Sequence, residues 1–348
     1  MMHPMNNVKA PPSKLCGEDF LAVADVLEIQ RDPQTIAAWN KFIRARPDDF
    51  FRAITEGLPE GTRVSVKIDQ KGKLDVTSRL EKDGKQLLEH HFTAEIKAGV
   101  ASLEYIRVAG ELQGRGIAKS AIANMLEFLQ GIGVWRTKTE AAYDNGAFTW
   151  ARFGLKPDSL HWERLKKNTL WPRLEMMREQ IPPDALKQIE TAAASDDPSA
   201  IWLIAGQKTR IDGVPIGRLL LYHSAENAFH EASEWKPPTK KDIWKGIANS
   251  ARERLSGLEK QLPPQVVQHL KECLDDPSPE AHARVLGVEN RVGGISLGQF
   301  MLVGAYWKGE LDMKNEMQRE IFTAYTASSN REAPAQPKPQ ASLPPPRS

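Results

Sequence analysis

The six residues Gln113–Ala118, with the sequence QGRGIA, have the composition of an anion-binding turn. They include two glycines and one arginine but no acid, and they lie between the apolar runs ASLEYIRVAGEL and KSAIANMLEFL. A glycine-rich turn that opens a helix leaves backbone N–H groups unpaired, and these donors and the helix dipole favour a phosphate. Gly114 and Gly116 permit backbone angles that other residues resist, while Arg115 and Lys119 add positive charge.

Two common phosphate-binding motifs do not fit this turn. A P-loop needs glycines where Gln113 and Ala118 stand. The dinucleotide-binding fingerprint needs its third glycine where Lys119 stands. It also needs a parallel βαβ setting, whereas the strands before this turn are predicted to be antiparallel.

The elements that must position the turn form a mixed α and β region. Residues 19–29, 33–45 and about 48–56 have the apolar spacing of helices. Four alternating segments joined by short turns then predict an antiparallel meander, namely TRVSVKIDQ, LDVTSRLE, QLLEHHFTAEI and VASLEYIRVA. An amphipathic helix follows the turn and ends at GIG, and VWRTKTEAA predicts a fifth strand.

A third phosphate motif does match. QGRGIA fits the [Q/R]-x-x-G-x-[G/A] motif of the GNAT-type N-acyltransferases, and YIRVAGELQGRGIA resembles that family's fourth strand, linker and pyrophosphate turn. The next helix and strand follow in family order. The resemblance covers about residues 60–156 and is sharp over 103–131. It implies an α+β, GNAT-like, mostly antiparallel sheet and acetyl-CoA, or another acyl-CoA, as co-substrate.

The resemblance also implies where the co-substrate would bind. In the family the fourth and fifth strands splay apart, and the pantetheine arm bonds to the exposed backbone of the fourth strand. The pyrophosphate would take the N–H groups of the turn. The expected cofactor-binding residues are Ile106, Arg107, Val108, Gln113, Gly114, Arg115, Gly116, Ile117, Ala118, Lys119 and Asn145.

Acyl transfer to an amine needs a base for the amine and a proton for the departing thiolate. Glu104 is the candidate base, because it lies on the strand that would face the acyl group; a solvated carboxylate on a strand is the alternative. Tyr143 is the candidate acid, just beyond the fifth strand, and a buried tyrosine bonded to backbone is its alternative.

The chain also departs from the family pattern. Phe153-Gly154-Leu155 resembles the closing signature, but Trp150 stands where the family's tyrosine acid is expected, and Asn145 comes late. The early helices are predicted to precede the meander instead of lying between the first two strands. No clear sixth or seventh strand follows residue 158.

The second half of the chain is predicted to be helical and repetitive. LEMMREQIPPDALKQI from Leu174 resembles LSGLEKQLPPQVVQHL from Leu255. The offset that carries Leu174 onto Leu255 also carries GVPIGRLLL, from Gly213, onto the similar GISLGQFML, from Gly294. We call this shift along the chain the repeat offset, and it predicts a duplicated helical module at the C-terminal side.

The expected organisation follows from these two halves. It is a disordered tail over 1–18, a GNAT-like domain over 19–158, helical repeats over 159–240 and 241–326, and a disordered Pro-rich tail over 327–348.

Other classes of site are disfavoured. The adjacent His90 and His91 should point to opposite faces of a strand, so no metal site is expected. The net charge of +2 demands neither nucleic acid nor membrane, and the lysines around KPPTKKDIWK fit a solvated linker. No apolar run approaches the roughly 20 residues of a spanning helix. With two distant cysteines and no h-region at the N-terminus, a cytoplasmic location is expected, or secretion by a route without a standard signal.

Two functions follow from these observations. The first is an acetyl-CoA-dependent N-acyltransferase acting on an amine, with a protein or peptide acceptor docked by the helical repeats. The second is a non-catalytic, acyltransferase-like binding protein or secreted effector whose repeats bind a protein partner.

Overall fold

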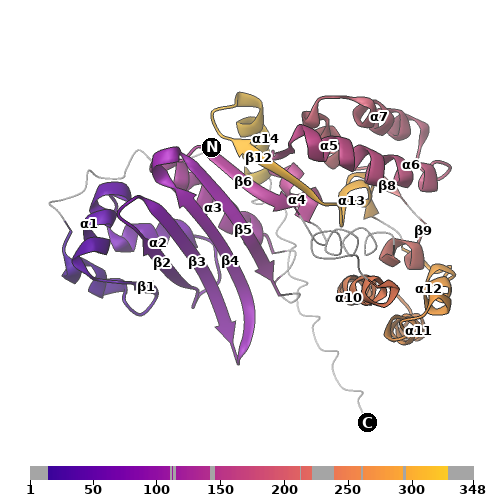
Figure 1. Cartoon of the computed structure of the whole chain (residues 1–348), viewed down its shortest axis with the longest axis horizontal. Helices are drawn as coiled ribbons and strands as arrows, with labels where there is room; N and C mark the ends of the chain where they lie inside the picture. The colour runs from indigo at the N-terminus through magenta and orange to yellow at the C-terminus, as the bar shows by residue number, and fades with distance from the viewer. Residues whose placement is uncertain are drawn as a thin grey trace, which may run out of the picture.

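A computed structural model describes residues 15–109, 112, 115–141, 146–211, 213–221, 239–259, 262–292 and 295–327. These residues form an α+β protein around one large, mostly antiparallel sheet of eight strands, in the order β1-β2-β3-β4-β5-β6-β12-β7 (Figure 1). The strands are β1 (Leu27–Ile29), β2 (Arg63–Ile68), β3 (Lys73–Lys82), β4 (Lys85–Glu95), β5 (Val100–Val108), β6 (Arg136–Ala141), β7 (Lys156–Pro157) and β12 (Trp307–Asp312).

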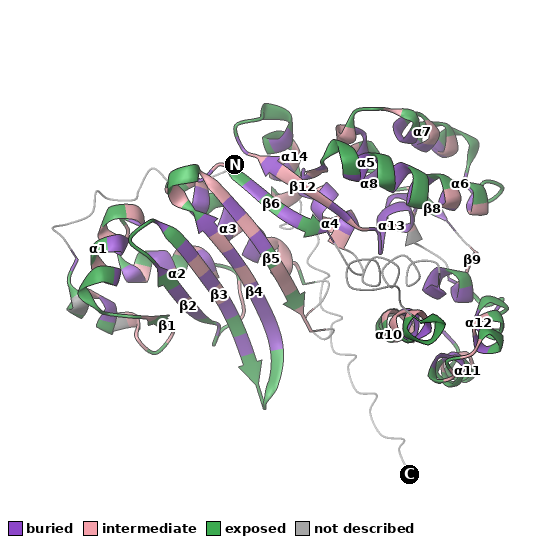
Figure 2. Ribbon diagram, in the orientation of Figure 1, coloured by how far each residue is buried: buried purple, intermediate pink, exposed green. Residues whose placement is uncertain are grey.

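The predicted meander is confirmed. Strands β2 to β5 pair antiparallel in sequence order. Along each strand, apolar residues alternate with polar ones, so one face of the sheet is buried and the other meets solvent (Figure 2). Helices α1 (Pro33–Phe42), α2 (Pro47–Thr55) and α3 (Ile117–Gly131) cover the apolar face, behind the strands in Figure 1.

Aromatic rings join these helices to one another. Trp39 of α1 meets Phe50 of α2 edge to face at 5.1 Å, and Phe50 meets Phe128 of α3 at 5.0 Å. All three rings are buried. Edge-to-face contacts add to the area that the rings bury, so this chain of rings holds the three helices against the sheet.

The structure corrects the helix predicted over 19–29. Residues Gly17–Val23 form a short 3-10 helix, and β1 follows as a strand that pairs parallel with β2. Phe20, Val23 and Leu27 do have helical spacing, but hydrogen bonding to β2 decides the conformation of the last three residues. As a result α1 and α2 lie between the first and second strands of the sheet.

The structure also corrects the expectation that no strand follows residue 158. Strand β12 lies within the segment assigned to the second helical repeat, yet it pairs antiparallel with both β6 and β7. Trp307 and Leu311 are buried, whereas Lys308 and Glu310 lie on the other side of the strand. The alternation of WKGELD was therefore readable, but its partners lie far earlier in the chain, on the other side of the whole helical segment.

The helical segment lies between β7 and β12 in the chain and is therefore enclosed by two neighbouring strands instead of following the sheet. Its elements are α5 (Ser159–Leu165), a π-helical turn (Lys166–Leu170), α6 (Trp171–Met177), α7 (Pro183–Ala194), a 3-10 turn (Pro198–Ala200), α8 (Ile201–Ala205), β8 (Arg210–Ile211), β9 (Val214–Pro215), α10 (Lys240–Leu258), α11 (Pro264–Asp275), α12 (Pro279–Leu286), β10 (Arg291–Val292), β11 (Ile295–Ser296) and α13 (Leu297–Leu302). Helices α4 (Gly146–Arg152) and α14 (Glu316–Ala327) flank the end of the sheet.

Two parts of the helical segment correspond at the repeat offset. Applying it to the bounds of α7, β8 and β9 gives those of α11, β10 and β11. The strands pair crosswise, β8 with β11 and β9 with β10. The Ile216 N–H donates to the Asn290 carbonyl at 2.8 Å, and the Leu297 N–H donates to the Thr209 carbonyl at 2.7 Å. The two parts therefore exchange equivalent contacts, as the halves of a two-fold symmetric pair do.

The predicted terminal tails lie almost wholly outside the described residues. None of the described helices is both long enough and apolar enough to span a bilayer.

Candidate functional site

The parallel strands β5 and β6 separate along their length. They pair only from Val100 with Arg136 to Leu103 with Thr139, although β5 continues to Val108. The Thr139 side chain donates to the Leu103 carbonyl at 3.3 Å, so a side chain takes the acceptor where the backbone ladder ends. Beyond this point the side of β5 that faces β6 has no strand paired to it among the described residues. We call the space between the two diverging strands the opening.

An irregularity in β5 marks the start of the opening. The register with β4 shifts between His91, opposite Tyr105, and Phe92, opposite Leu103, so Glu104 is the extra residue of a β-bulge. A bulge bends its strand and increases its twist, which turns β5 away from β6.

Glu104, the candidate base, is exposed in this bulge. Its Oε1 accepts a hydrogen bond from the Thr93 hydroxyl of β4 at 3.3 Å. Thr93 lies on the solvent-exposed face of the sheet, so the carboxylate also lies on that face, at the entrance of the opening.

The three residues predicted to contact the pantetheine follow the bulge. The Ala109 N–H donates to the Leu87 carbonyl of β4 at 2.9 Å. Backbone groups alternate in direction along a strand, so those of Ile106 and Val108 point toward the opening. The Arg107 guanidinium lies 5.5 Å from the centre of the Tyr105 ring.

The predicted phosphate turn ends at the N-terminus of α3. Gly116 has a φ of 78° and is the N-cap, and no side chain of the described residues caps this end. The first N–H groups of a helix, here those of Ile117 and Ala118, lack acceptors within the helix. Gln113 and Gly114 lie outside the described residues. Arg115 is exposed just before the helix.

Two of the predicted side chains have other contacts. Ile117 is buried with Leu80, Leu87 and Leu88 in a small apolar cluster, so only its backbone is left for a ligand. The Lys119 ammonium lies 4.2 Å from the centre of the Tyr325 ring of α14, which the Arg152 guanidinium also meets at 4.8 Å.

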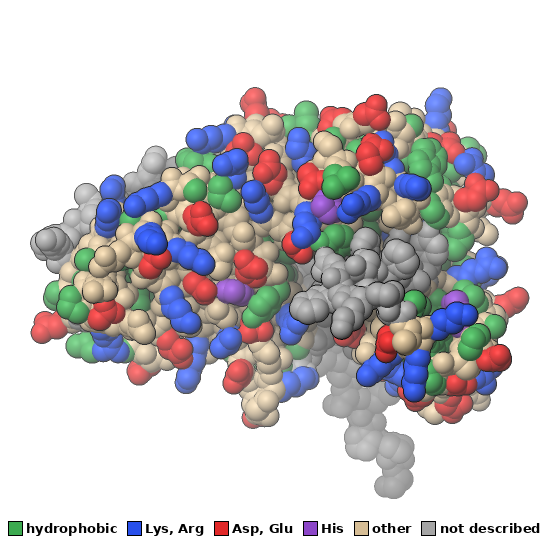
Figure 3. All heavy atoms as spheres, in the orientation of Figure 1, with side chains coloured by type: hydrophobic (Ala, Val, Ile, Leu, Met, Phe, Trp, Pro, Cys, Tyr) green, Lys and Arg blue, Asp and Glu red, His purple; other side chains and the backbone are tan. Residues whose placement is uncertain are grey.

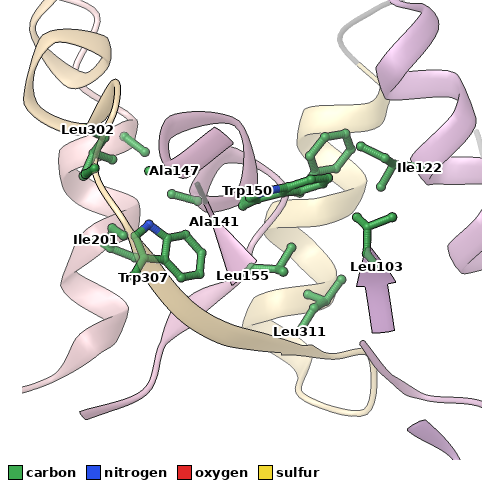
Figure 4. Packing of buried hydrophobic residues seen from close by; sticks show 14 of the residues in the cluster. Leu103, Ile122, Ala141, Ala147, Trp150, Leu155, Ile201, Leu302, Trp307 and Leu311 are labelled. Carbon is green, nitrogen blue, oxygen red and sulfur yellow. The ribbon is translucent and has the colours of Figure 1, made fainter. Parts of the chain in front are cut away.

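Neither Tyr143 nor Asn145 lies within the described residues. Trp150, at the place of the family's tyrosine, is buried and stacks near Phe153 at 5.9 Å. Figure 4 shows it within the packing that also includes Leu103, Ala147 and Leu155. An indole in this core does not reach the opening, so Trp150 has a structural role.

A polar group on β6 and β12 was missed by the sequence analysis. Glu140 of β6 accepts from the Tyr306 hydroxyl at 3.3 Å and from the Lys308 ammonium at 2.5 Å. Burial is the main cause that raises the pKa of Tyr306, and the charge of Glu140 raises it further. The hydrogen bond to Glu140 raises the pKa of Lys308. No local pattern could reveal this group, because Glu140 and Tyr306 are 166 residues apart.

The same group borders helix α5. The ring of His161 lies 5.8 Å from that of Tyr306, and its Nδ1 is 2.8 Å from Asp158 Oδ1. Burial acts to raise the pKa of Asp158, but the hydrogen bonds from the His161 N–H and ring outweigh it and lower that pKa. Asp158 is also the N-cap of α5, so helix capping fixes the position of His161.

The polar face of the sheet carries interspersed positive and negative side chains over β2 to β5 (Figure 3). It is hollowed by ≈ 440 Å³ over β2 and β3, beside Arg63 and Arg79. The Arg79 guanidinium is 3.0 Å from Glu89 Oε1, which occupies it with an ion pair. This hollow lies two strands from β5 and is separate from the opening.

The adjacent histidines point to opposite faces, as the alternation predicts. His90 is 1% exposed, and burial, with a smaller effect from the charge of His91, lowers its pKa to about 3. His91 lies on the polar face with Nε2 3.3 Å from Asp75 Oδ1. Across the described residues, no three His, Cys, Asp or Glu side chains are grouped as metal ligands.

Comparison with known proteins gives no relative. No family model, no curated protein and no solved structure matches this chain.

Proposed function

We propose that this protein is an acyl-CoA-dependent N-acyltransferase that uses acetyl-CoA or a related thioester to acylate an amine. The observation that carries the proposal is the opening between β5 and β6, with a bulge at its start and a helix N-terminus without a side-chain cap after β5. A thioester arm needs a slot with backbone groups directed into it from one wall, and its pyrophosphate needs N–H donors at one end. The opening and α3 supply these in sequence order.

Two further features support a GNAT-like arrangement. The helices α1 and α2 lie between β1 and β2, and two late strands, β7 and β12, complete the sheet. Both were missing from the sequence-based comparison with the family, and both bring the chain closer to the family pattern.

The chemistry assigned to Glu104 follows from its position. An acceptor amine arrives mostly as ammonium and must lose a proton before it attacks the thioester. A carboxylate at the start of the opening can accept that proton, and such general-base assistance contributes about 10²–10⁴ in rate. Glu104→Gln should lower kcat by about that factor and leave CoA affinity unchanged. Glu95→Gln, at the far end of β4, is the matched control.

Binding of the co-substrate is tested by calorimetry with CoA and acetyl-CoA on the full chain. Gly116→Glu places a carboxylate where the pyrophosphate would bind and should weaken CoA by about 100-fold or more, roughly 2.7 kcal/mol. Gly133→Glu is the matched control at the other end of α3, because both glycines have positive φ, 78° and 84°, with nothing within 4 Å of an added Cβ. Both variants carry the same left-handed strain of roughly 1–2 kcal/mol. Wild-type protein that binds neither CoA nor acetyl-CoA would refute the proposal.

The buried Trp150 favours a second candidate, a non-catalytic acyltransferase-like binding protein. Here the opening would bind acyl-CoA or have lost its ligand, and the helical segment would carry the function. We also propose that the segments over 171–221 and 252–302 are a duplicated module that docks a protein or peptide. CoA binding without acyl transfer to any amine would favour this second function over the first.

A further inference from the structure

Two carboxylates stand at corresponding positions at the start of the opening. Ser102 pairs with Lys138 and Leu103 with Thr139, and these are the last pairs of the parallel register. The next residues along the two strands are Glu104 and Glu140. Both are exposed, and both follow the polar face, because Leu103 and Thr139 are buried on the other side. The entrance therefore has a carboxylate on each wall.

Glu140 differs from Glu104 in its partners. One of its oxygens accepts from the Lys308 ammonium and the other from the Tyr306 hydroxyl. The glutamate thus already binds one primary ammonium and touches one hydroxyl. The raised pKa of Tyr306 keeps that hydroxyl protonated at neutral pH.

We propose that the opening receives a primary ammonium between Glu104 and Glu140, and that Glu140 and Tyr306 carry the proton that the thiolate needs. This inference rests on the proposed acyltransferase function and names its acceptor class and its acid. It replaces Tyr143 with Tyr306 as the proton donor.

The step balances without another reactant. The ammonium gives one proton to Glu140, and the amine lone pair forms a C–N bond to the thioester carbonyl carbon. As the C–S bond breaks, the sulfur takes the proton of the Tyr306 hydroxyl, and protonated Glu140 returns one to the phenolate. The second proton on nitrogen passes to Glu104 and then to water. One ammonium and one thioester give one amide, one thiol and one released proton.

An ordinary cross-strand ion pair is the competing explanation for Glu140, since Lys308 lies directly opposite on β12. The two explanations differ in what Lys308 does. If Glu140 serves only the ion pair, removing either partner has the same effect. If Glu140 accepts protons from the acceptor, removing Lys308 leaves its carboxylate free to act.

The experiment measures thiol release from acetyl-CoA with a panel of primary amines, from ethylamine to a lysine-containing peptide, and CoA affinity by calorimetry. Glu140→Gln and Tyr306→Phe should each lower kcat by about 100-fold or more, with CoA affinity unchanged. Lys308→Gln should keep the rate within about 3-fold, and Glu140→Asp should recover part of what Glu140→Gln loses. Unchanged CoA affinity also shows that each variant is folded.

Three results would overturn the inference. They are equal losses in Glu140→Gln and Lys308→Gln, a wild-type rate in Tyr306→Phe, and a wild-type protein that binds CoA but releases no thiol with any amine. Failure of the wild-type protein to bind CoA is a different outcome, because it removes the proposed function itself.

Discussion

The main sheet and the helical segment between β7 and β12 are organised in opposite ways. The helical segment repeats its contacts at the repeat offset, in helix bounds, crossed strand pairs and backbone hydrogen bonds. The sheet does not repeat. Its two faces differ in polarity, and its irregularities, the bulge at Glu104 and the separation of β5 from β6, lie together.

The difference indicates where each kind of change can be tolerated. Contacts that occur twice belong to the packing of the helical segment, so a change at one site should have the same effect at its counterpart. Features that occur once, such as the bulge, are not needed to form a sheet. These are the positions where a functional role is the more economical explanation.

The largest expected effect tests the repetition. An added Cβ at Gly217 would overlap the Val285 carbonyl oxygen, and one at Gly298 would overlap the Ile204 carbonyl oxygen. The repeat offset relates both members of these two pairs, Gly217 to Gly298 and Ile204 to Val285. Both carbonyls belong to backbone that cannot move aside cheaply, so Gly217→Ala and Gly298→Ala should each cost more than about 4 kcal/mol.

Denaturant unfolding followed by tryptophan fluorescence measures both variants. Gly206→Ala and Gly287→Ala are the controls, because these glycines have a φ of −75° and meet no added Cβ closer than 3.1 Å. They should change stability by about 1 kcal/mol or less. A large loss in only one of Gly217→Ala and Gly298→Ala would break the equivalence of the two parts.

The second effect tests the difference between the faces of the sheet. The pKa of buried His90 is about 3, below its ordinary value of 6.5. As pH falls through this window the unfolded chain takes up a proton that the native protein refuses, so stability is lost at about 1.4 kcal/mol per pH unit. The loss should reach about 3 kcal/mol at pH 4 and be absent above pH 7.

His90→Phe keeps the ring volume and should flatten this part of the pH profile of unfolding. His91→Gln changes the neighbouring residue on the polar face and should leave the acid sensitivity in place. The face assignment fails if the two variants respond to acid in the same way.

The third effect concerns an arginine in α6. Arg173 is 0% exposed and donates to the carbonyls of Phe300 and Met301 at 3.0 and 2.7 Å, at the end of α13. Arg173→Met leaves these carbonyls without that donor and should cost about 2–3 kcal/mol. Arg254, at the corresponding position of α10, is less deeply buried, so Arg254→Met should cost less. Equal losses would show that exposure does not distinguish the two sites.

The smallest effect tests where the two parts differ. The Trp202 indole of α8 donates to the Leu155 carbonyl at 3.0 Å and so ties this part to the sheet. The corresponding residue of α12 is Ala283, whose side chain carries no donor. Trp202→Phe should lower the unfolding free energy by about 1 kcal/mol, with Trp171→Phe as a more exposed control. No loss in thermal stability relative to that control would remove the link.

Much of the sheet was predictable because its signals are local. Strands β2 to β5 each alternate along their length and are joined by short turns, so their order and faces followed from adjacent sequence. Glu104 was found in the same way, from its place on a predicted strand. Strand β1 was missed because three residues carry too little alternation to outweigh the helical spacing around them.

The sequence by itself determined the meander, the helix after QGRGIA, the opposite faces of His90 and His91, and the correspondence at the repeat offset. Each is a period or a spacing that neighbouring residues impose through backbone geometry. Only the tertiary structure decided that β12 enters the sheet between β6 and β7, that β5 leaves β6 after Leu103, and that Tyr306 meets Glu140. These depend on which distant segments pack together, and that choice is set by the burial of the whole apolar face, which no local pattern contains.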